Sequence, residues 1–285
     1  MAINNQRFLY QTNVFTTLGI RFWDPILDKQ VIDDLMVTAR PEKKLSPVIT
    51  SFRTASGIYA FQGLPGLHDT EYPVQDETNI IKKKCFIIEV KDRRKQFLTT
   101  VFKVNLPLPY EGIYPNTAYN SPLEESLPGF YLFSAPTRSS SPGLAVVRGQ
   151  LITAVTGNPA AYAILEVRVK DRTWYGVADE RGCIAVLFPY PAINGMFLAS
   201  PPVSIYQQNW EIIIRVRYDP EMLIFPYKSD FPELRSIWSQ SSGIIIPSEG
   251  NPPVTEFSYN LFFGQELVLR TEGQSGSVLL INKGD

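Results

Sequence analysis

One pattern occurs twice in this chain, and it constrains the fold more than any other feature. The segment GIYAFQGLPG at residues 57–66 recurs in outline as GCIAVLFPYP at residues 182–191. Each copy follows a short polar turn and begins with a glycine, Gly57 in the first and Gly182 in the second. The two glycines are 125 residues apart.

A second pair of segments keeps almost the same spacing. After a loop, each copy of the pattern leads to a long apolar strand, CFIIEVK at 85–91 and EIIIRVR at 211–217. The offset between Phe86 and Ile212 is 126 residues. Apolar and other residues alternate along both segments, as expected for β-strands with one face in a core. A nearly constant offset at two landmarks predicts a duplicated β-domain.

The composition supports short strands joined by tight turns. The 285 residues include 23 prolines, 18 glycines and 12% aromatic residues, and no segment has a long apolar period of 3.6 residues. We therefore predict an all-β protein with two tandem, related β-sandwiches of the transthyretin or immunoglobulin-like kind. Charged residues make up 19% of the chain and the net charge is −1, so a nucleic-acid binder is disfavoured and copies repel one another little.

The predicted domains follow from these patterns. We place a first β-sandwich at 1–105, a proline-rich connector at 106–143, a second β-sandwich at 144–227 and a β-rich C-terminal extension at 228–285. The extension contains one predicted short helix at 231–238 and four predicted strands. These strands either complete the second sandwich or form a separate appendix, and the sequence leaves both alternatives open.

The two cysteines and the N-terminus carry no strong functional signal. Cys85 and Cys183 lie in apolar strands with no zinc-motif spacing, so we expect free, buried thiols that act as small hydrophobic residues. No cofactor or metal is predicted. The first residues have no apolar core of signal-peptide length, and no apolar run is long enough to span a bilayer. We therefore expect cytoplasmic synthesis, with assembly into a particle as one possible destination.

The second module resembles a known domain family. The features are GQLIT at 149–153, GNP at 157–159, AILEVR at 163–168, GVADERG at 176–182 and FPYP at 188–191. They are similar to the carboxypeptidase-regulatory-like, or transthyretin-like, β-sandwich over about residues 144–220. The resemblance implies an accessory module that acts in contact or stability, and it implies no activity.

A second resemblance is carried by shorter segments. YLFSAPTR at 131–138, PGLAVVR at 142–148 and NLFFGQELVLRT at 260–271 resemble segments of proteins encoded with phage-tail-like contractile injection systems. This likeness implies a structural accessory part of a baseplate or cap.

Few residues suggest catalysis. His68 is the only histidine and has no nucleophile motif beside it, so we expect a solvated loop residue. A group of acids close in sequence could bind calcium at one end of the sandwich, although their spacing is not that of an EF-hand. The group consists of Asp24, Asp28, Asp33 and Asp34, with Glu42 as a further candidate ligand. Trp174 and Tyr175 follow a turn and are the aromatic pair that we expect to be most exposed.

These observations favour a non-catalytic structural subunit of a large assembly, a baseplate or cap component of a contractile injection system. Its partners would be other protein subunits, with repeated copies in a ring. The candidate contact residues are the aromatic side chains of the connector and of one turn, Tyr110, Tyr114, Tyr119, Phe130, Tyr131, Phe133, Trp174 and Tyr175. The alternatives are a carbohydrate- or surface-binding module and a glycan hydrolase with paired carboxylates.

Overall fold

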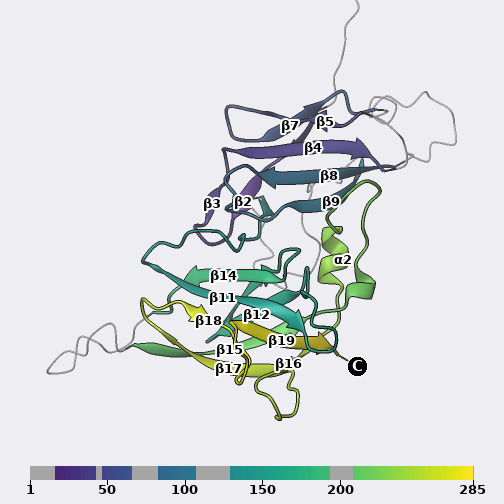
Figure 1. Cartoon of the computed structure of the whole chain (residues 1–285). Helices are drawn as coiled ribbons and strands as arrows, with labels where there is room; N and C mark the ends of the chain where they lie inside the picture. Colours follow the sequence, from purple (N-terminus) through teal and green to yellow (C-terminus); the bar gives the residue numbers. More distant parts are fainter. Residues whose placement is uncertain (1–16, 43–46, 66–82, 107–128, 193–207, 285) are drawn as a thin grey trace, which may run out of the picture.

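A computed structural model describes residues 17–42, 47–65, 83–106, 129–192 and 208–284, and it confirms the all-β class. Figure 1 shows two stacked β-bodies, the first above the second. A short helix lies beside the boundary between them, which we call the seam. No helix in the described ranges is long and apolar enough to cross a bilayer.

The strands of the first body and of the segment after it are short except for three. They are β1 (Thr17–Ile20), β2 (Phe22–Asp24), β3 (Lys29–Gln30), β4 (Leu35–Pro41), β5 (Ile49–Thr50), β6 (Phe52–Arg53), β7 (Tyr59–Gln62), β8 (Lys84–Asp92), β9 (Thr100–Leu106) and β10 (Phe130–Tyr131). They form sheets in the orders β5-β4-β8-β9, β1-β7-β6 and β10-β2-β3.

The second body has longer strands and two larger sheets. Its elements are β11 (Leu144–Thr153), β12 (Ile164–Val169), β13 (Arg172–Val177), β14 (Cys183–Pro189), β15 (Asn209–Arg217), the 3₁₀ turn η3 (Pro220–Met222), helix α2 (Leu234–Trp238), β16 (Gly243–Ile246), β17 (Glu256–Phe262), β18 (Leu267–Val268) and β19 (Val278–Lys283). The sheet orders are β14-β11-β19-β16, with β18 also on β11, and β13-β12-β15-β17.

The duplication predicted from the sequence has a direct counterpart in the strand order. The sheet β5-β4-β8-β9 of the first body corresponds, strand by strand and in chain order, to β13-β12-β15-β17 of the second. The antiparallel pair β1–β7 corresponds to β11–β14 in the same way. The matching strands β8 and β15 turn equivalent residues into the cores, since Phe86, Ile88, Val90, Ile212, Ile214 and Val216 are all at most 2% exposed.

The polar turn before each repeated segment is built from the same hydrogen bonds. The amide of Gly57 donates to the Thr54 carbonyl at 3.0 Å, and the amide of Ile58 donates to the Thr54 hydroxyl at 3.0 Å. In the second body, Asp179 takes the place of Thr54 and accepts from Gly182 at 3.0 Å through its carbonyl. Both glycines are left-handed, with φ of 75° and 73°, which explains why glycine stands at both positions.

The C-terminal strands complete the second sandwich, which decides between the two alternatives that the sequence left open. Strand β19 lies inside a sheet, parallel to β11 on one side and antiparallel to β16 on the other. Strand β17 forms the edge of the other sheet by pairing with β15. Side chains from this segment, such as Ile245, Leu261 and Leu279, are at most 1% exposed in the second core.

The two bodies are joined by a common hydrophobic cluster. The cluster of the first body also contains Ile164 and Val177 from the second, and Leu234, Ile237 and Trp238 from α2. The strand β9 meets the segment before the helix in a parallel bridge between Val101 and Glu233. The residues after β15 therefore pack on the first body as well as on the second.

Candidate functional site at the junction of the two sandwiches

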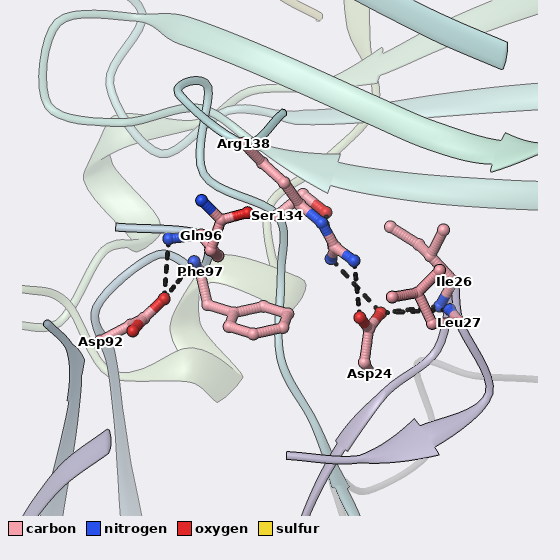
Figure 2. A network of polar contacts seen from close by, with 8 residues as sticks. All are labelled: Asp24, Ile26, Leu27, Asp92, Gln96, Phe97, Ser134 and Arg138. Atoms are coloured by element: carbon pink, nitrogen blue, oxygen red, sulfur yellow. Dashed lines mark hydrogen bonds and ion pairs between the residues drawn. The ribbon is translucent and has the colours of Figure 1, made fainter. Parts of the chain in front are cut away.

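A buried ion pair lies where the first body meets the segment that leads to the second. Asp24 ends strand β2, and Arg138 is 114 residues further along the chain. Their side chains are 3% and 5% exposed, and Arg138 Nη2 lies 2.5 Å from Asp24 Oδ2. Arg138 Nη1 donates to Asp24 Oδ1 at 3.3 Å and to the Ser134 hydroxyl at 3.1 Å (Figure 2).

The remaining contacts fix this pair in position. Asp24 Oδ1 also accepts from the amides of Ile26 at 3.0 Å and Leu27 at 3.4 Å, so the carboxylate caps its own turn. The guanidinium carbon of Arg138 lies 4.9 Å from the centre of the Phe97 ring. Asp92 fixes the backbone that carries this ring, because its Oδ2 accepts from the amides of Gln96 at 2.7 Å and Phe97 at 3.0 Å (Figure 2).

The network continues into the second body through Arg148 of β11. Its guanidinium donates to the backbone carbonyls of Pro136 and Arg138, the latter at 2.7 Å. Arg148 Nε also lies 2.8 Å from Glu266 Oε1, in the loop before β18. One polar chain therefore connects β2, the junction segment and β11, and a chain of this kind restrains movement between the sandwiches.

A cavity of about 380 Å³ opens beside this network, between the two bodies. Its buried apolar lining comes from both sandwiches and from α2, namely Val101, Phe133, Val177, Leu234 and Ile237. Charged residues among its lining include Lys91, Lys95, Glu180 and Arg181. An apolar pocket with a few polar groups at a domain boundary is a common form of binding site.

An exposed apolar strip, residues 222–227, lies next to this cavity. Four of its six side chains are large, apolar and exposed, with Met222 at 44%, Ile224 at 58%, Phe225 at 51% and Tyr227 at 59%. The strip meets the cavity at Tyr162, which lines the cavity and contacts the Phe225 ring with 6.1 Å between ring centres.

The backbone of the strip is held while its side chains face solvent. The amide of Ile224 donates to the Ser236 hydroxyl at 3.0 Å, and the Ile224 carbonyl accepts from the Glu233 amide at 2.8 Å. No sequence pattern described above includes this strip. A usable signal was present, since MLIFPY is an apolar run between Glu221 and Lys228 that belongs to no predicted strand.

Some of the predicted contact residues lie outside the described ranges, and others are buried. Tyr110, Tyr114 and Tyr119 lie outside the described residues. Phe130 and Phe133 are 2% and 5% exposed, so the expectation that they contact a partner is wrong. The physical reason is that β10 pairs in parallel with β2, which places the Phe130 ring on Phe102 with 4.2 Å between the ring centres.

The remaining three candidates are half-buried near the seam. Tyr131 pairs with Trp23 in the ladder between β10 and β2. Trp174 stacks on Phe188 with 6.1 Å between ring centres, and Tyr175 meets Trp238 edge-on at 5.4 Å. Trp174 and Tyr175 are therefore less exposed than expected, because Trp174 packs against the core of the second body and Tyr175 packs against the cluster that joins the two bodies.

The acids that suggested a calcium site each have a different partner. Asp24 is paired with Arg138, Asp28 accepts from the Trp23 indole at 3.1 Å, and Asp33 lies 2.7 Å from Arg53. Asp34 pairs with Arg94 and Glu42 pairs with Lys103. Within the described ranges, no three His, Cys, Asp or Glu side chains are grouped as metal ligands. His68 lies outside those ranges.

Both cysteines are free, as expected, but each is only half-buried. Burial raises the pKa of the Cys183 thiol above its ordinary value. Burial, followed by the Glu42 carboxylate, raises the pKa of Cys85 from 9.0 to about 11. Lys103 Nζ lies 2.7 Å from Glu42 Oε1, and this contact raises the pKa of Lys103.

We expect the Cys85 thiol to react slowly in the natural chain and faster when Glu42 is replaced. At pH 8 a pKa near 11 leaves about 100-fold less thiolate than a pKa of 9.0. A Glu42→Gln change removes the negative charge, lowers the pKa and should speed iodoacetamide labelling of Cys85 about 10-fold. Peptide mass spectrometry follows the rate, with Glu89→Gln on the same strand as the matched control. An unchanged rate in Glu42→Gln would contradict the role of this carboxylate.

Comparison with known proteins assigns no family. No family model matches the chain, and no curated protein matches it. Among solved structures, the shaft pilin SpaA of Lactobacillus rhamnosus GG is 10% identical, with a TM-score of 0.25 over 74% of this chain and 90% of the pilin. The TIE protein of Bacillus anthracis is 9% identical, with a TM-score of 0.23 over 87% of this chain and 44% of that protein.

A 9R-lipoxygenase from Cyanothece PCC8801 also matches, at 15% identity and a TM-score of 0.19 over 49% of this chain. The chain spans only 16% of that enzyme. At these identities and TM-scores, the similarities say nothing about activity or partners in this chain.

Proposed function

We propose that this protein is a non-catalytic structural subunit of a larger protein assembly, and that it binds a neighbouring subunit through the strip 222–227 and the cavity beside it. The single observation that carries the proposal is the continuity of four exposed large apolar side chains with an apolar cavity. Contiguous exposed apolar surface of this kind marks contact sites, and a pocket can receive an anchoring side chain.

The rigid junction supports the same proposal. A buried ion pair, a polar chain into β11 and a common hydrophobic cluster hold the two sandwiches in one arrangement. A fixed arrangement keeps the strip and the cavity, which is lined from both bodies, in a constant geometry. A partner then meets a pre-organised surface, and little conformational freedom is lost on binding.

The finer proposal is a baseplate or cap position in a phage-tail-like contractile injection particle, with copies repeated in a ring. Its support is the resemblance of residues 131–138, 142–148 and 260–271 to accessory proteins of such systems. The carboxypeptidase-regulatory-like resemblance of the second module agrees with an accessory role.

Sedimentation of native cell extracts tests both levels of the proposal. The protein is expected in a fast-sedimenting fraction, and mass spectrometry of that fraction identifies its neighbours. Sheath, tube and baseplate proteins in the same fraction would support the injection particle. Clear turnover in a glycosidase panel, abolished by a single Asp→Asn change, would overturn the non-catalytic role.

Two substitutions in the strip should release the subunit from the particle. Phe225→Ser with Tyr227→Ser removes two aromatic side chains that are at least half exposed, so the fold should remain while the protein moves to the slow fraction. The expected loss of association is at least 100-fold, the order seen when contact anchors are removed. Val155→Ser is the matched control, since that side chain is 81% exposed and lies in a turn of the second body. Equal release by the control, or none by the double variant, would exclude the strip.

A further inference from the structure

The second sandwich has two sides at which its sheets end in edge strands. The first body covers one of these sides. The side between β13 and β14 faces the first body, where Trp174, Tyr175 and Leu187 line a small cavity together with Pro25 and Ile26. The opposite side is bounded by β16 and β17 and lies away from the first body (Figure 1). The edges on that side therefore decide what else the sandwich can contact.

Of these two edges, β16 is already paired. The amide of Ile245 donates to the Val254 carbonyl at 2.7 Å, and the amide of Val254 donates back at 2.9 Å. Strand β17 pairs with β15 along all seven of its residues, and the described part of the chain places no further strand on its outer side.

The register shows which backbone groups of β17 face outward. Phe263 donates its amide to the Gln208 carbonyl at 3.0 Å, continuing a ladder in which Phe262 lies opposite Asn209. Hydrogen-bonded pairs alternate in an antiparallel ladder, so Ser258 and Asn260 direct their N–H and C=O groups away from β15. Among the described residues, no turn or loop backbone group bonds these groups, so they can pair with another extended chain.

The edge has few of the features that usually prevent such pairing. Exposed edges are commonly blocked by charged side chains, proline or bulges. Among the seven residues of β17, EFSYNLF, only the first, Glu256, is charged, and none is proline. Phe257 and Tyr259 are half-buried and meet edge-on, with 5.0 Å between ring centres.

We propose that β17 pairs antiparallel with β17 of a second copy, around a two-fold axis at Tyr259, so that the sheet β13-β12-β15-β17 continues across both copies. This is the register with full overlap of the seven residues. It places Ser258 opposite Asn260 of the partner subunit, and both have outward-facing backbone groups. A two-fold interface requires such self-complementarity.

The charges and apolar groups also fit a second copy. Glu256 lies opposite Phe262 of the partner subunit, so no like charges face each other. Its own charge is paired, because Arg215 Nη2 lies 2.6 Å from Glu256 Oε2. Phe257 lies opposite Leu261 of the partner subunit on the inner face of the sheet, so apolar side chains face each other there as well. This proposed contact is separate from the strip 222–227 and does not depend on the proposed function.

Sedimentation equilibrium of the purified chain tests the pairing. We expect a species of twice 32.2 kDa for the natural sequence. Ser258→Pro should weaken the dimer at least 100-fold, because it removes an outward-facing N–H that bonds no group in the described part of the chain; proline is tolerated at such edge positions. Ser258→Thr is the matched control and should stay dimeric. Circular dichroism and the thermal midpoint establish that each variant is folded.

A natural chain that remains at 32.2 kDa up to on the order of 100 µM would overturn the proposal. A folded Ser258→Pro variant that remains dimeric would overturn it equally.

Disulfide trapping tests the register. Ser258→Cys and Asn260→Cys are made separately in a chain with Cys85→Ala and Cys183→Ala, and the two proteins are then mixed and oxidised. Residues opposite each other in a hydrogen-bonded pair lie about 5.5 Å apart at Cα, within the range of a disulfide. We expect the mixed disulfide to exceed either homodimer about 10-fold. Dominant homodimers, or no disulfide, would exclude the axis at Tyr259.

Discussion

Replacing Asp24 with alanine is expected to lower the free energy of unfolding by about 3–5 kcal/mol. The change leaves the Arg138 guanidinium without its carboxylate at a position where the arginine is 4% exposed. An unpaired buried charge retains the full penalty of leaving water, and the neighbouring Ser134 hydroxyl supplies one acceptor only. The amides of Ile26 and Leu27 also lose an acceptor.

Urea unfolding measures this effect, and Asp33→Ala is the matched control. Asp33 also pairs with an arginine at 2.7 Å in the same body, but the two side chains are 63% and 48% exposed. Exposed pairs contribute about 0–1 kcal/mol, so the control should be nearly neutral. Similar losses for the two variants would contradict a special role for the buried pair.

A double variant separates the ion pair from the turn. Asp24→Leu with Arg138→Met replaces both charges by apolar groups and should recover most of the stability lost in Asp24→Ala, as found for other buried pairs. If the double variant is as unstable as the single one, the loss comes from the turn that Asp24 caps. Fluorescence of Trp238 at the seam would report whether the two bodies still pack together.

Replacing Gly182 with alanine is expected to destabilise the protein by on the order of 3 kcal/mol or more. Gly182 has a φ of 73°, and a Cβ there would lie 2.3 Å from the Leu151 carbonyl oxygen. That oxygen belongs to β11, and the amide of Leu151 donates to the Gly182 carbonyl at 2.8 Å. The turn cannot move away without breaking the start of the β11–β14 pairing.

Gly157→Ala is the matched control for this change. Gly157 has a similar φ of 69° in the same body, but nothing lies within 4 Å of its added Cβ. The control therefore measures the left-handed backbone alone, about 1–2 kcal/mol. Thermal unfolding of both variants should place Gly182→Ala well below Gly157→Ala. Equal midpoints would show that the close approach to β11 has no effect.

The sequence predicted the repeating parts of this fold well. Alternation at 85–91 and 211–217 identified β8 and β15 and the residues that face the cores, because a strand with one buried face has a period of two. The glycines at the start of each repeat marked the same turn twice. Short helix α2 was also predicted, with its start three residues further along the chain than expected.

Most of the candidate site could not be predicted from the sequence. Aromatic side chains in a proline-rich segment suggested an external contact, yet Phe130 and Phe133 became part of the chain's own core. Hydrophobicity is the same signal for a buried contact inside a chain and for a contact between chains. Only the pairing of β10 with β2 distinguishes the two.

The sequence by itself determined the β-class, the duplication and the tight turns, because these depend on side-chain period and on backbone angles within a few residues. Tertiary structure alone decided that the C-terminal strands enter the second sandwich, that Asp24 meets Arg138, and that the strip 222–227 borders a cavity. These features join residues distant in the chain, such as the 114 positions between Asp24 and Arg138. Contacts between residues so far apart leave no local sequence pattern, because only the folded chain brings the partners together.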